Sequence, residues 1–242
     1  MARAHLPAGY DLKRFGEIDS TNAEAFRLSA KGETGPLWIW ADEQLKGRGR
    51  DGRAWVSEKG NLYATLMLPV GDGENASELS FVAALTLYDV CQAFFLSSTL
   101  SLKWPNDILL GGKKVAGILL ERKGDCLAIG CGLNIAHYPL DTQFQATCLT
   151  EHGGRAHVGD AFTALAAAMD NWLKRWRAEG FKIIRKTWLS RAHGLGKEIT
   201  VKQPSGDISG VFETLDDEGG LMLVGQDGKK SRILAGDVFF PS

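Results

Sequence analysis

Apolar residues recur along this chain with two different periods, which predict helices in some regions and strands in others. A spacing of three or four positions over 79–96 and over 160–178 predicts two core helices. A shorter helix is expected after Gly180, over about 181–192. Another should begin after Asp19–Asn22, where Thr21 and Glu24 form a capping box. In the 160–178 helix one stripe holds Phe162, Leu165, Met169, Trp172, Leu173 and Trp176.

Compact apolar runs rich in β-forming residues predict a sheet in the same part of the chain. Two strands are expected over 37–42 and 61–68. Two more flank Gly111-Gly112, a hairpin signal, and residues 126–135 continue the meander as a further strand. The predicted class is α+β, with a mixed or antiparallel sheet flanked by helices.

The pattern changes near residue 194. From Glu198 onward, short alternating runs are separated by the turn sequences PSGD, DEGG and QDG. About five short strands so close together are typical of a small SH3-like barrel. We therefore predict a catalytic domain over 1–193 and an SH3-like C-terminal domain over 194–242.

Composition excludes several classes of function. The 242 residues carry a net charge of −1, which gives no bulk attraction to nucleic acid or to an anionic membrane. The four cysteines show no C-x-x-C spacing, and no histidine pattern suggests a metal site. The N-terminus has no apolar signal region, and the apolar run 81–96 is too short to cross a bilayer. We expect a cytoplasmic protein.

The densest cluster of charge is GRGRDGR, residues 47–53. Its first six residues satisfy G-x-G-x-x-G, which suggests dinucleotide binding only where a helix follows the glycines. Residues 53–68 instead predict extended structure, so this function is excluded. Two interpretations stay open: a solvated basic hairpin tip, or a loop whose glycines and arginines bind an anion such as carboxylate or phosphate.

A second unusual segment is KWPND, residues 103–107, between two apolar strand runs. Asn106 and Asp107 supply an amide and a carboxylate at the start of a strand. Lys114 then leads into the apolar run VAGILL, where its ammonium could lie at the edge of a cavity or simply extend to water.

Together these features resemble the biotin protein ligase family. Six segments between residues 19 and 134 carry the resemblance: Asp19–Asn22, the Gln44–Trp55 motif, Gly60–Tyr63, Lys103–Asp107, Lys114–Leu119, and Gly130-x-Gly132-x-Asn134. Each is weak alone, but all six in the family's order are specific. The resemblance implies the class II synthetase-like biotin/lipoate ligase fold, followed by the small C-terminal barrel.

The same resemblance implies an activity and its substrates. Such ligases join biotin to ATP, with Mg²⁺ bound to the ATP, and form biotinyl-5′-AMP and pyrophosphate. They then transfer biotin to a lysine of a biotin carboxyl carrier domain in a biotin-dependent carboxylase. Members of the family often form a homodimer through a sheet edge. Only 18 residues precede Asp19, so we expect a ligase without an N-terminal DNA-binding domain.

Residue roles also follow from the resemblance. Ser20, Thr21 and Gln44 would hydrogen-bond the ureido ring of biotin, and Gly47 and Arg48 would lie along its tail and carboxylate. Asn22 is a further ligand-binding position. Gly49 and Arg50 belong to the loop that closes over the adenylate, Arg53 would meet the ATP phosphates, and Trp55 and Asn134 the adenine. Asn106 and Asp107 would lie by the phosphates and metal, and Lys114 would stabilise charge at the reacting oxygens. The last of the implied ligand-binding positions are Gly117 and Gly132.

This sequence differs from the usual family motifs at several positions, and two other functions stay open. Glu58-Lys59 replaces a common proline and glycine, Thr65 replaces a serine, and Cys131 could make its strand sensitive to thiol reagents. A lipoate or octanoate ligase shares the fold and the acyl-adenylate chemistry, although its loop is less rich in arginine. A non-catalytic protein that retains biotinyl-AMP as an effector is the alternative from another class.

Overall fold

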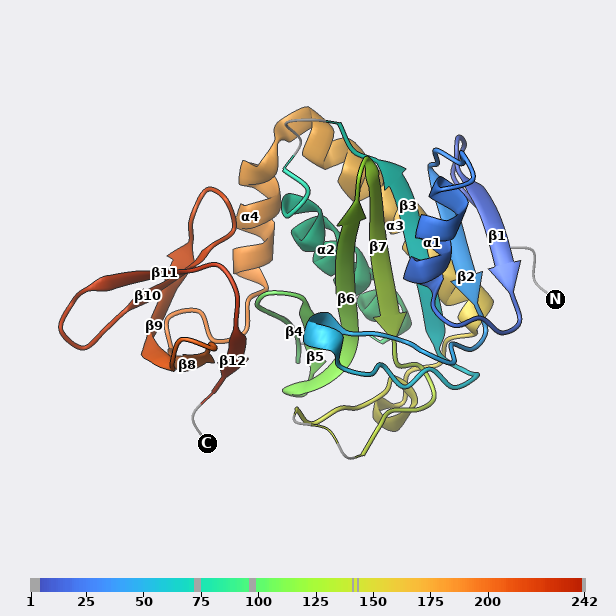
Figure 1. Cartoon of the computed structure of the whole chain (residues 1–242). Helices are drawn as coiled ribbons and strands as arrows, with labels where there is room; N and C mark the ends of the chain where they lie inside the picture. The colour runs from blue at the N-terminus through green and yellow to red at the C-terminus, as the bar shows by residue number, and fades with distance from the viewer. Residues whose placement is uncertain (1–4, 72–74, 96–98, 141, 143, 241–242) are drawn as a thin grey trace.

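The computed structural model describes residues 5–71, 75–95, 99–140, 142 and 144–240. Its larger part is a seven-stranded sheet in the order β1-β2-β3-β7-β6-β5-β4 (Figure 1). All neighbouring pairs in this sheet are antiparallel except β1 with β2. The strands are β1 (Asp11–Phe15), β2 (Leu37–Ala41), β3 (Leu62–Pro69), β4 (Leu100–Lys103), β5 (Asp107–Leu110), β6 (Lys113–Lys123) and β7 (Cys126–Leu133).

The alternation of side chains along the central strands gives the sheet two different faces. Trp38 and Leu66 belong to the main core, which helices α2 (Glu78–Phe94), α3 (Val158–Glu179) and α4 (Phe181–Ser190) cover. Ile39 and Met67, one position further along each strand, belong to a smaller cluster under helix α1 (Thr21–Ser29). The rest of this second face is therefore left for the loops that build the site.

The helices confirm the periodic pattern of the sequence, with two differences at their ends. Ser20, not Thr21, is the N-cap of α1: its Oγ accepts a hydrogen bond from the backbone N–H of Ala23, whereas Glu24 pairs with Arg27. Helix α2 ends at Phe94, and residue 96 of the predicted helix lies outside the described residues. The predicted α3 stripe is buried except for Trp176, which is partly exposed.

Strand β1 was not predicted, because DLKRF carries few apolar residues. It is an edge strand in parallel register with β2, and backbone pairing rather than side-chain burial defines it. The hairpin around Gly111-Gly112 is confirmed as β5 and β6, and β7 continues the meander. Short helical turns, η1 (Arg50–Gly52) and η2 (Thr150–His152), lie in the loops after β2 and β7.

The C-terminal part is a five-stranded antiparallel sheet in the order β11-β10-β9-β8-β12, the predicted SH3-like unit. Its strands are β8 (Glu198–Lys202), β9 (Ile208–Leu215), β10 (Leu221–Val224), β11 (Lys230–Ile233) and β12 (Asp237–Phe239). It packs beside α4 and β4 (Figure 1), and Trp104 Nε1 donates a hydrogen bond to the Gly219 carbonyl across this junction. The division at 193/194 stays a prediction. In the part of the chain that the structure describes, no helix is long and apolar enough to span a bilayer.

Candidate active site

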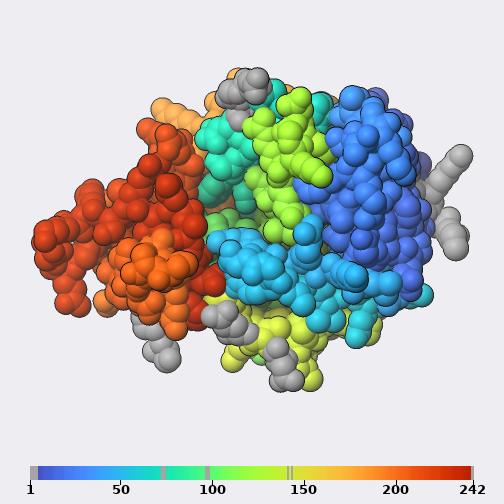
Figure 2. All heavy atoms as spheres, in the orientation of Figure 1, coloured from blue at the N-terminus to red at the C-terminus, as the bar shows by residue number. Residues whose placement is uncertain are grey.

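A cavity of about 550 Å³ opens on the sheet face that carries α1. The segment between β2 and β3, which contains GRGRDGR, crosses this face between the C-terminal sheet and the N-terminal elements (Figure 2). All but one of the predicted site residues line the cavity: Ser20, Thr21, Asn22, Gln44, Arg48, Gly49, Arg50, Arg53, Trp55, Asn106, Asp107, Lys114, Gly117, Gly132 and Asn134. The folded chain thus brings together segments from both halves of the larger domain.

Gly47 is the exception, and its surroundings give it a different function in the loop. A Cβ on Gly47 would lie 2.3 Å from the Trp55 carbonyl oxygen. The Trp55 N–H donates a hydrogen bond of 2.9 Å to the Gly47 carbonyl. Gly47 therefore allows the two arms of the arginine loop to pair closely. Its predicted contact with the biotin tail stays a prediction.

The loop turns back at η1, and no longer helix follows the glycines. Asp51 and Gly52 adopt positive φ angles of 54° and 72°, and the Gly49 N–H donates to the Arg53 carbonyl at 2.7 Å. This geometry confirms that the loop is not the start of a dinucleotide-binding helix.

One end of the cavity is lined mainly by uncharged polar side chains, with the Arg48–Glu121 ion pair beside Asn22. The N–H and Oγ1 of Thr21 donate hydrogen bonds to Gln44 Oε1 at 2.9 and 3.0 Å. Thr65 Oγ1 lies 2.7 Å from Thr21 Oγ1 and 2.6 Å from Asn22 Oδ1. Ser20, Thr21, Asn22 and Thr65 are all buried. These groups already bond to one another, so the network is a preformed set of uncharged donors and acceptors that suits a compact polar ligand.

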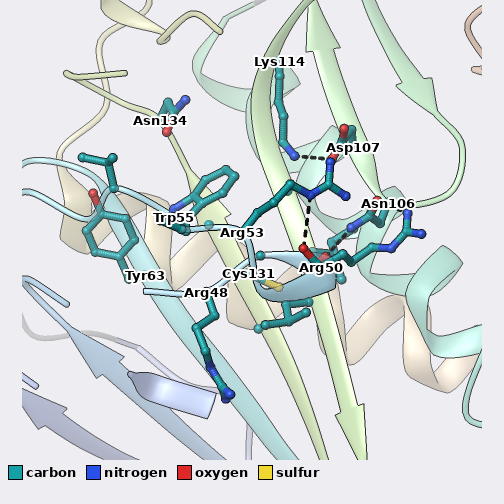
Figure 3. A pocket seen from close by; sticks show the side chains of 18 of the residues that line it. Arg48, Arg50, Arg53, Trp55, Tyr63, Asn106, Asp107, Lys114, Cys131 and Asn134 are labelled. Carbon is teal, nitrogen blue, oxygen red and sulfur yellow. Dashed lines mark hydrogen bonds and ion pairs between the residues drawn. The ribbon is translucent and has the colours of Figure 1, made fainter. Parts of the chain in front are cut away.

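The other end of the cavity is charged. Lys114 Nζ lies 2.5 Å from Asp107 Oδ1, and the two side chains point toward one another (Figure 3). Asn106 Nδ2 donates to the Ile118 carbonyl, and its Oδ1 accepts from Arg50 at 3.3 Å. These groups meet where β5 and β6 begin. Arg48 points away from this cluster and pairs with Glu121 at 3.1 Å.

A β-bulge turns Lys114 into the cavity. In the β5–β6 pairing, Ile108 faces Ala116 but Leu109 faces Lys114, so Val115 is an extra residue. In a regular strand Lys114 would share the face of Ala116, which belongs to the main core. The bulge instead places Lys114 on the face of Gly117, as bulges commonly do near active sites.

The floor of the cavity is a glycine pair beneath an indole ring. Gly117 and Gly132 are register partners on β6 and β7. A Cβ on Gly132 would lie 2.7 Å from Trp55 Cε2, and one on Gly117 would lie 3.0 Å from Trp55 Cζ3. Only glycines let the ring lie this close to the strands. Lys114 Nζ is 5.2 Å from the centre of the same ring.

Asn134 and Cys131 also lie at the cavity wall. Asn134 is buried, and its Nδ2 donates to the Thr147 carbonyl at 3.0 Å, which fixes the direction of the amide. The Cys131 thiol is buried, and burial raises its pKa to about 12. A thiol that stays protonated is a poor nucleophile, which argues against the expected sensitivity of this strand to thiol reagents.

Two wall residues had no signal in the sequence. Asp237 comes from β12 of the C-terminal sheet, and its two carboxylate oxygens accept hydrogen bonds of 3.1 Å from Arg53. Phe144 comes from the segment after β7 and packs on Phe239 of β12, with ring centres 5.0 Å apart. Neither belongs to a motif, because their position depends on how the two sheets pack together.

Over the described residues there is no group of three or more His, Cys, Asp or Glu side chains that could hold a metal ion. The expectation of no resident metal site stays a prediction. Mg²⁺ usually binds proteins through one or two carboxylates together with substrate phosphates, and so does not need such a group.

Comparison with known proteins agrees with this geometry. The model of the "Biotin/lipoate A/B protein ligase family" matches residues 15–134, and that of the "Biotin protein ligase C terminal domain" matches residues 194–240. A biotin–[acetyl-CoA-carboxylase] ligase of Paracoccus denitrificans is 42% identical over 92% of this chain and 97% of its own length. The bifunctional ligase/repressor BirA of Escherichia coli is 28% identical over 91% of this chain and 71% of its own length.

The fold is also that of a solved ligase. The biotin protein ligase from Aquifex aeolicus in complex with biotin and ATP superposes with a TM-score of 0.84. It is 30% identical, and the match covers 95% of this chain and 97% of that one. Both the predicted biotin/lipoate ligase fold and the predicted C-terminal unit are confirmed. The chain belongs to the biotin protein ligase family.

Proposed function

We propose that this chain activates biotin with ATP and transfers it to a lysine of a biotin carboxyl carrier domain. The observation that carries the proposal is a single cavity whose two ends differ in charge. One end offers buried uncharged donors and acceptors, and the other offers the Lys114–Asp107 pair with Arg50 and Arg53 nearby. A substrate that is neutral at one end and reacts as an anion at the other fits this arrangement.

The uncharged end would hold the fused ureido ring of biotin. That ring has N–H donors and a carbonyl acceptor, which the side chains of Ser20, Thr21 and Gln44 can match. Asn22 is held by Glu121 and the Leu119 carbonyl, and so forms a fixed wall. A buried site built to form such hydrogen bonds rejects a ligand that lacks them. Lipoate and octanoate have no ureido group, which favours biotin.

The charged end would serve adenylation. A carboxylate oxygen of biotin attacks the α-phosphorus of ATP, and the bond from that phosphorus to the bridging oxygen breaks to release pyrophosphate. Negative groups must approach one another in this step, and positioned cations offset their repulsion. Lys114 would act at the reacting oxygens, while Arg53, held by Asp237, would lie along the phosphates.

Mg²⁺ would enter as a complex with ATP. The side-chain oxygens of Asp107 and Asn106 lie together at the charged end, and oxygen ligands of this kind suit Mg²⁺. Lys114 is the only close partner of Asp107 Oδ1 among the described residues, and their contact is outside hydrogen-bond geometry. Asp107 is therefore the group that would meet the metal, and the metal would neutralise charge on the phosphates.

Transfer would follow in the same cavity. The amine of the acceptor lysine attacks the acyl carbon of biotinyl-5′-AMP, the bond to the phosphate oxygen breaks, and AMP leaves. Trp55 on its glycine floor would pack against the adenine, where an aromatic face adds about 1 kcal/mol. The arginine loop, with Arg48 and Arg50, would exclude water from the adenylate until the acceptor arrives.

The test is pyrophosphate release from ATP and Mg²⁺ with biotin, lipoate and octanoate in parallel, followed by transfer to an added acceptor domain. We expect release and transfer with biotin. Release with lipoate instead would overturn the substrate but keep the fold. Biotin binding without release would favour the non-catalytic effector.

Three further properties are proposed with this function. A cytoplasmic location is supported by four cysteines that are all unpaired and buried. The net charge of −1 supports the proposal that the protein does not bind nucleic acid. A homodimer would use the edge strand β1, which has no partner on its outer side among the described residues. Sedimentation with and without biotin would test the last of these.

A further inference from the structure

A second buried lysine lies beside the charged end of the cavity. Lys103, the last residue of β4, is only 6% exposed. It is the register partner of Asp107 across the β4–β5 hairpin, so their side chains leave the sheet on the same face, which is the face of the cavity. The family motif implies roles for Asn106 and Asp107 but none for Lys103.

Within the described part of the chain, aromatic rings rather than carboxylates are the close neighbours of the Lys103 ammonium. Its Nζ lies 3.5 Å from the centre of the Phe144 ring and 6.0 Å from that of Phe239. Among the described residues, no carboxylate oxygen is within the 4.0 Å that defines an ion pair. Lys114, Arg48 and Arg53 each have such a partner. A buried cation with aromatic neighbours alone is costly unless an anion binds to it.

The groups around Lys103 identify that anion. Asp107, Lys114, Asp237 and Arg53 are the charged groups that act on it, and burial outweighs them and lowers the pKa of Lys103 to about 8. All four of those groups line the cavity at its charged end, as does Phe144. Lys103 is not itself a lining residue: its Nζ lies against the Phe144 ring, directly behind the charged end of the cavity where the phosphates of ATP would lie.

We propose that Lys103 binds the β- and γ-phosphates of ATP, and hence the pyrophosphate that leaves, during adenylation only. This inference rests on the proposed function, because it assigns a residue to one half-reaction of that site. Biotinyl-5′-AMP carries a single phosphate, so transfer to the acceptor has no group for Lys103 to hold. The residue thus distinguishes the two half-reactions.

The experiment compares wild type with Lys103→Met, which keeps the length of the side chain and removes its charge. We expect the KM for ATP to rise about 10- to 100-fold, the range for losing a charge-assisted hydrogen bond. Pyrophosphate-dependent reversal of adenylation should weaken by a similar factor. Transfer from purified biotinyl-5′-AMP to an acceptor domain, and the Kd for biotin, should change less than about twofold on the same scale.

Two further variants separate binding from packing. Lys103→Arg keeps the charge and should recover part of the ATP affinity. Lys202→Met removes the exposed cation on Phe239, whose Nζ is 4.7 Å from that ring, and should leave the KM for ATP unchanged. An unchanged KM for ATP in Lys103→Met would overturn the proposal. So would equal losses in both half-reactions, which would indicate a structural role.

Calorimetric titration of pyrophosphate with Mg²⁺, without biotin, keeps this inference separate from the proposed function. If no acid supports pyrophosphate release in wild type, the function fails. Weaker pyrophosphate binding by Lys103→Met than by wild type would still support the role of Lys103. Equal binding by the two proteins would reject it.

Discussion

Lys103 should make the protein less stable at neutral pH than a variant that lacks its charge. Its pKa falls from 10.5 to about 8 through burial, and each pKa unit corresponds to about 1.4 kcal/mol. The charged form in the fold therefore costs about 3 kcal/mol. Replacement by methionine removes this cost but also loses contact with two aromatic rings, worth about 1–2 kcal/mol. We expect Lys103→Met to be more stable at pH 7 by about 1–2 kcal/mol.

The sign of the pH dependence follows from proton binding. Between pH 8 and pH 10.5 the unfolded chain keeps the lysine proton while the folded chain releases it. Stability of the wild type therefore rises with pH in this window, and no such contribution comes from the variant. The advantage of Lys103→Met should shrink as the pH rises from 7 and reverse near pH 10, where most of the cost is gone.

Urea unfolding of both proteins at pH 7, 8.5 and 10 measures the difference, with tryptophan fluorescence as the signal. Taking the difference between wild type and variant cancels the titration of other groups. Lys202→Met serves as the control, since its ammonium is exposed and should show no such trend. A difference between Lys103→Met and wild type that stays constant with pH would refute the burial argument.

Three other outcomes are expected. Lys114→Ala should lower pyrophosphate release about 10²- to 10³-fold with an unchanged circular dichroism spectrum, and full activity would remove Lys114 from the reaction. Gly132→Ala should displace Trp55, since the new Cβ would lie 2.7 Å from its ring, and should weaken ATP binding. Gly16→Ala is the control: a Cβ on Gly16 would meet open space, so this change should leave ATP binding unaffected. Cys131 should react with a thiol reagent only after unfolding, because it is buried and its pKa is about 12; rapid labelling of the native protein would contradict this.

Local sequence was enough for most of the secondary structure, because burial on one side imposes a period that can be read directly. The α3 stripe is an example. Strands β2 and β3 are buried on both faces, and compact apolar runs predicted them instead. The sequence pattern did not predict strand β1, because this strand lies at an edge of the sheet, where backbone pairing with β2 holds a polar segment. The N-cap of α1 was placed one residue late, since Ser20 and Thr21 are both chemically able to cap a helix.

Residue order alone was enough to predict the two kinds of sheet, the glycine-arginine loop and the motifs that identify the family, because each depends on neighbours within a few residues. Other features of the site depend on the assembled fold. The bulge at Val115 selects the face on which Lys114 emerges, and packing of the two sheets brings Asp237 to Arg53 across 184 positions. The same junction buries Lys103 without an anion, because only the assembled fold determines which charges lose contact with water.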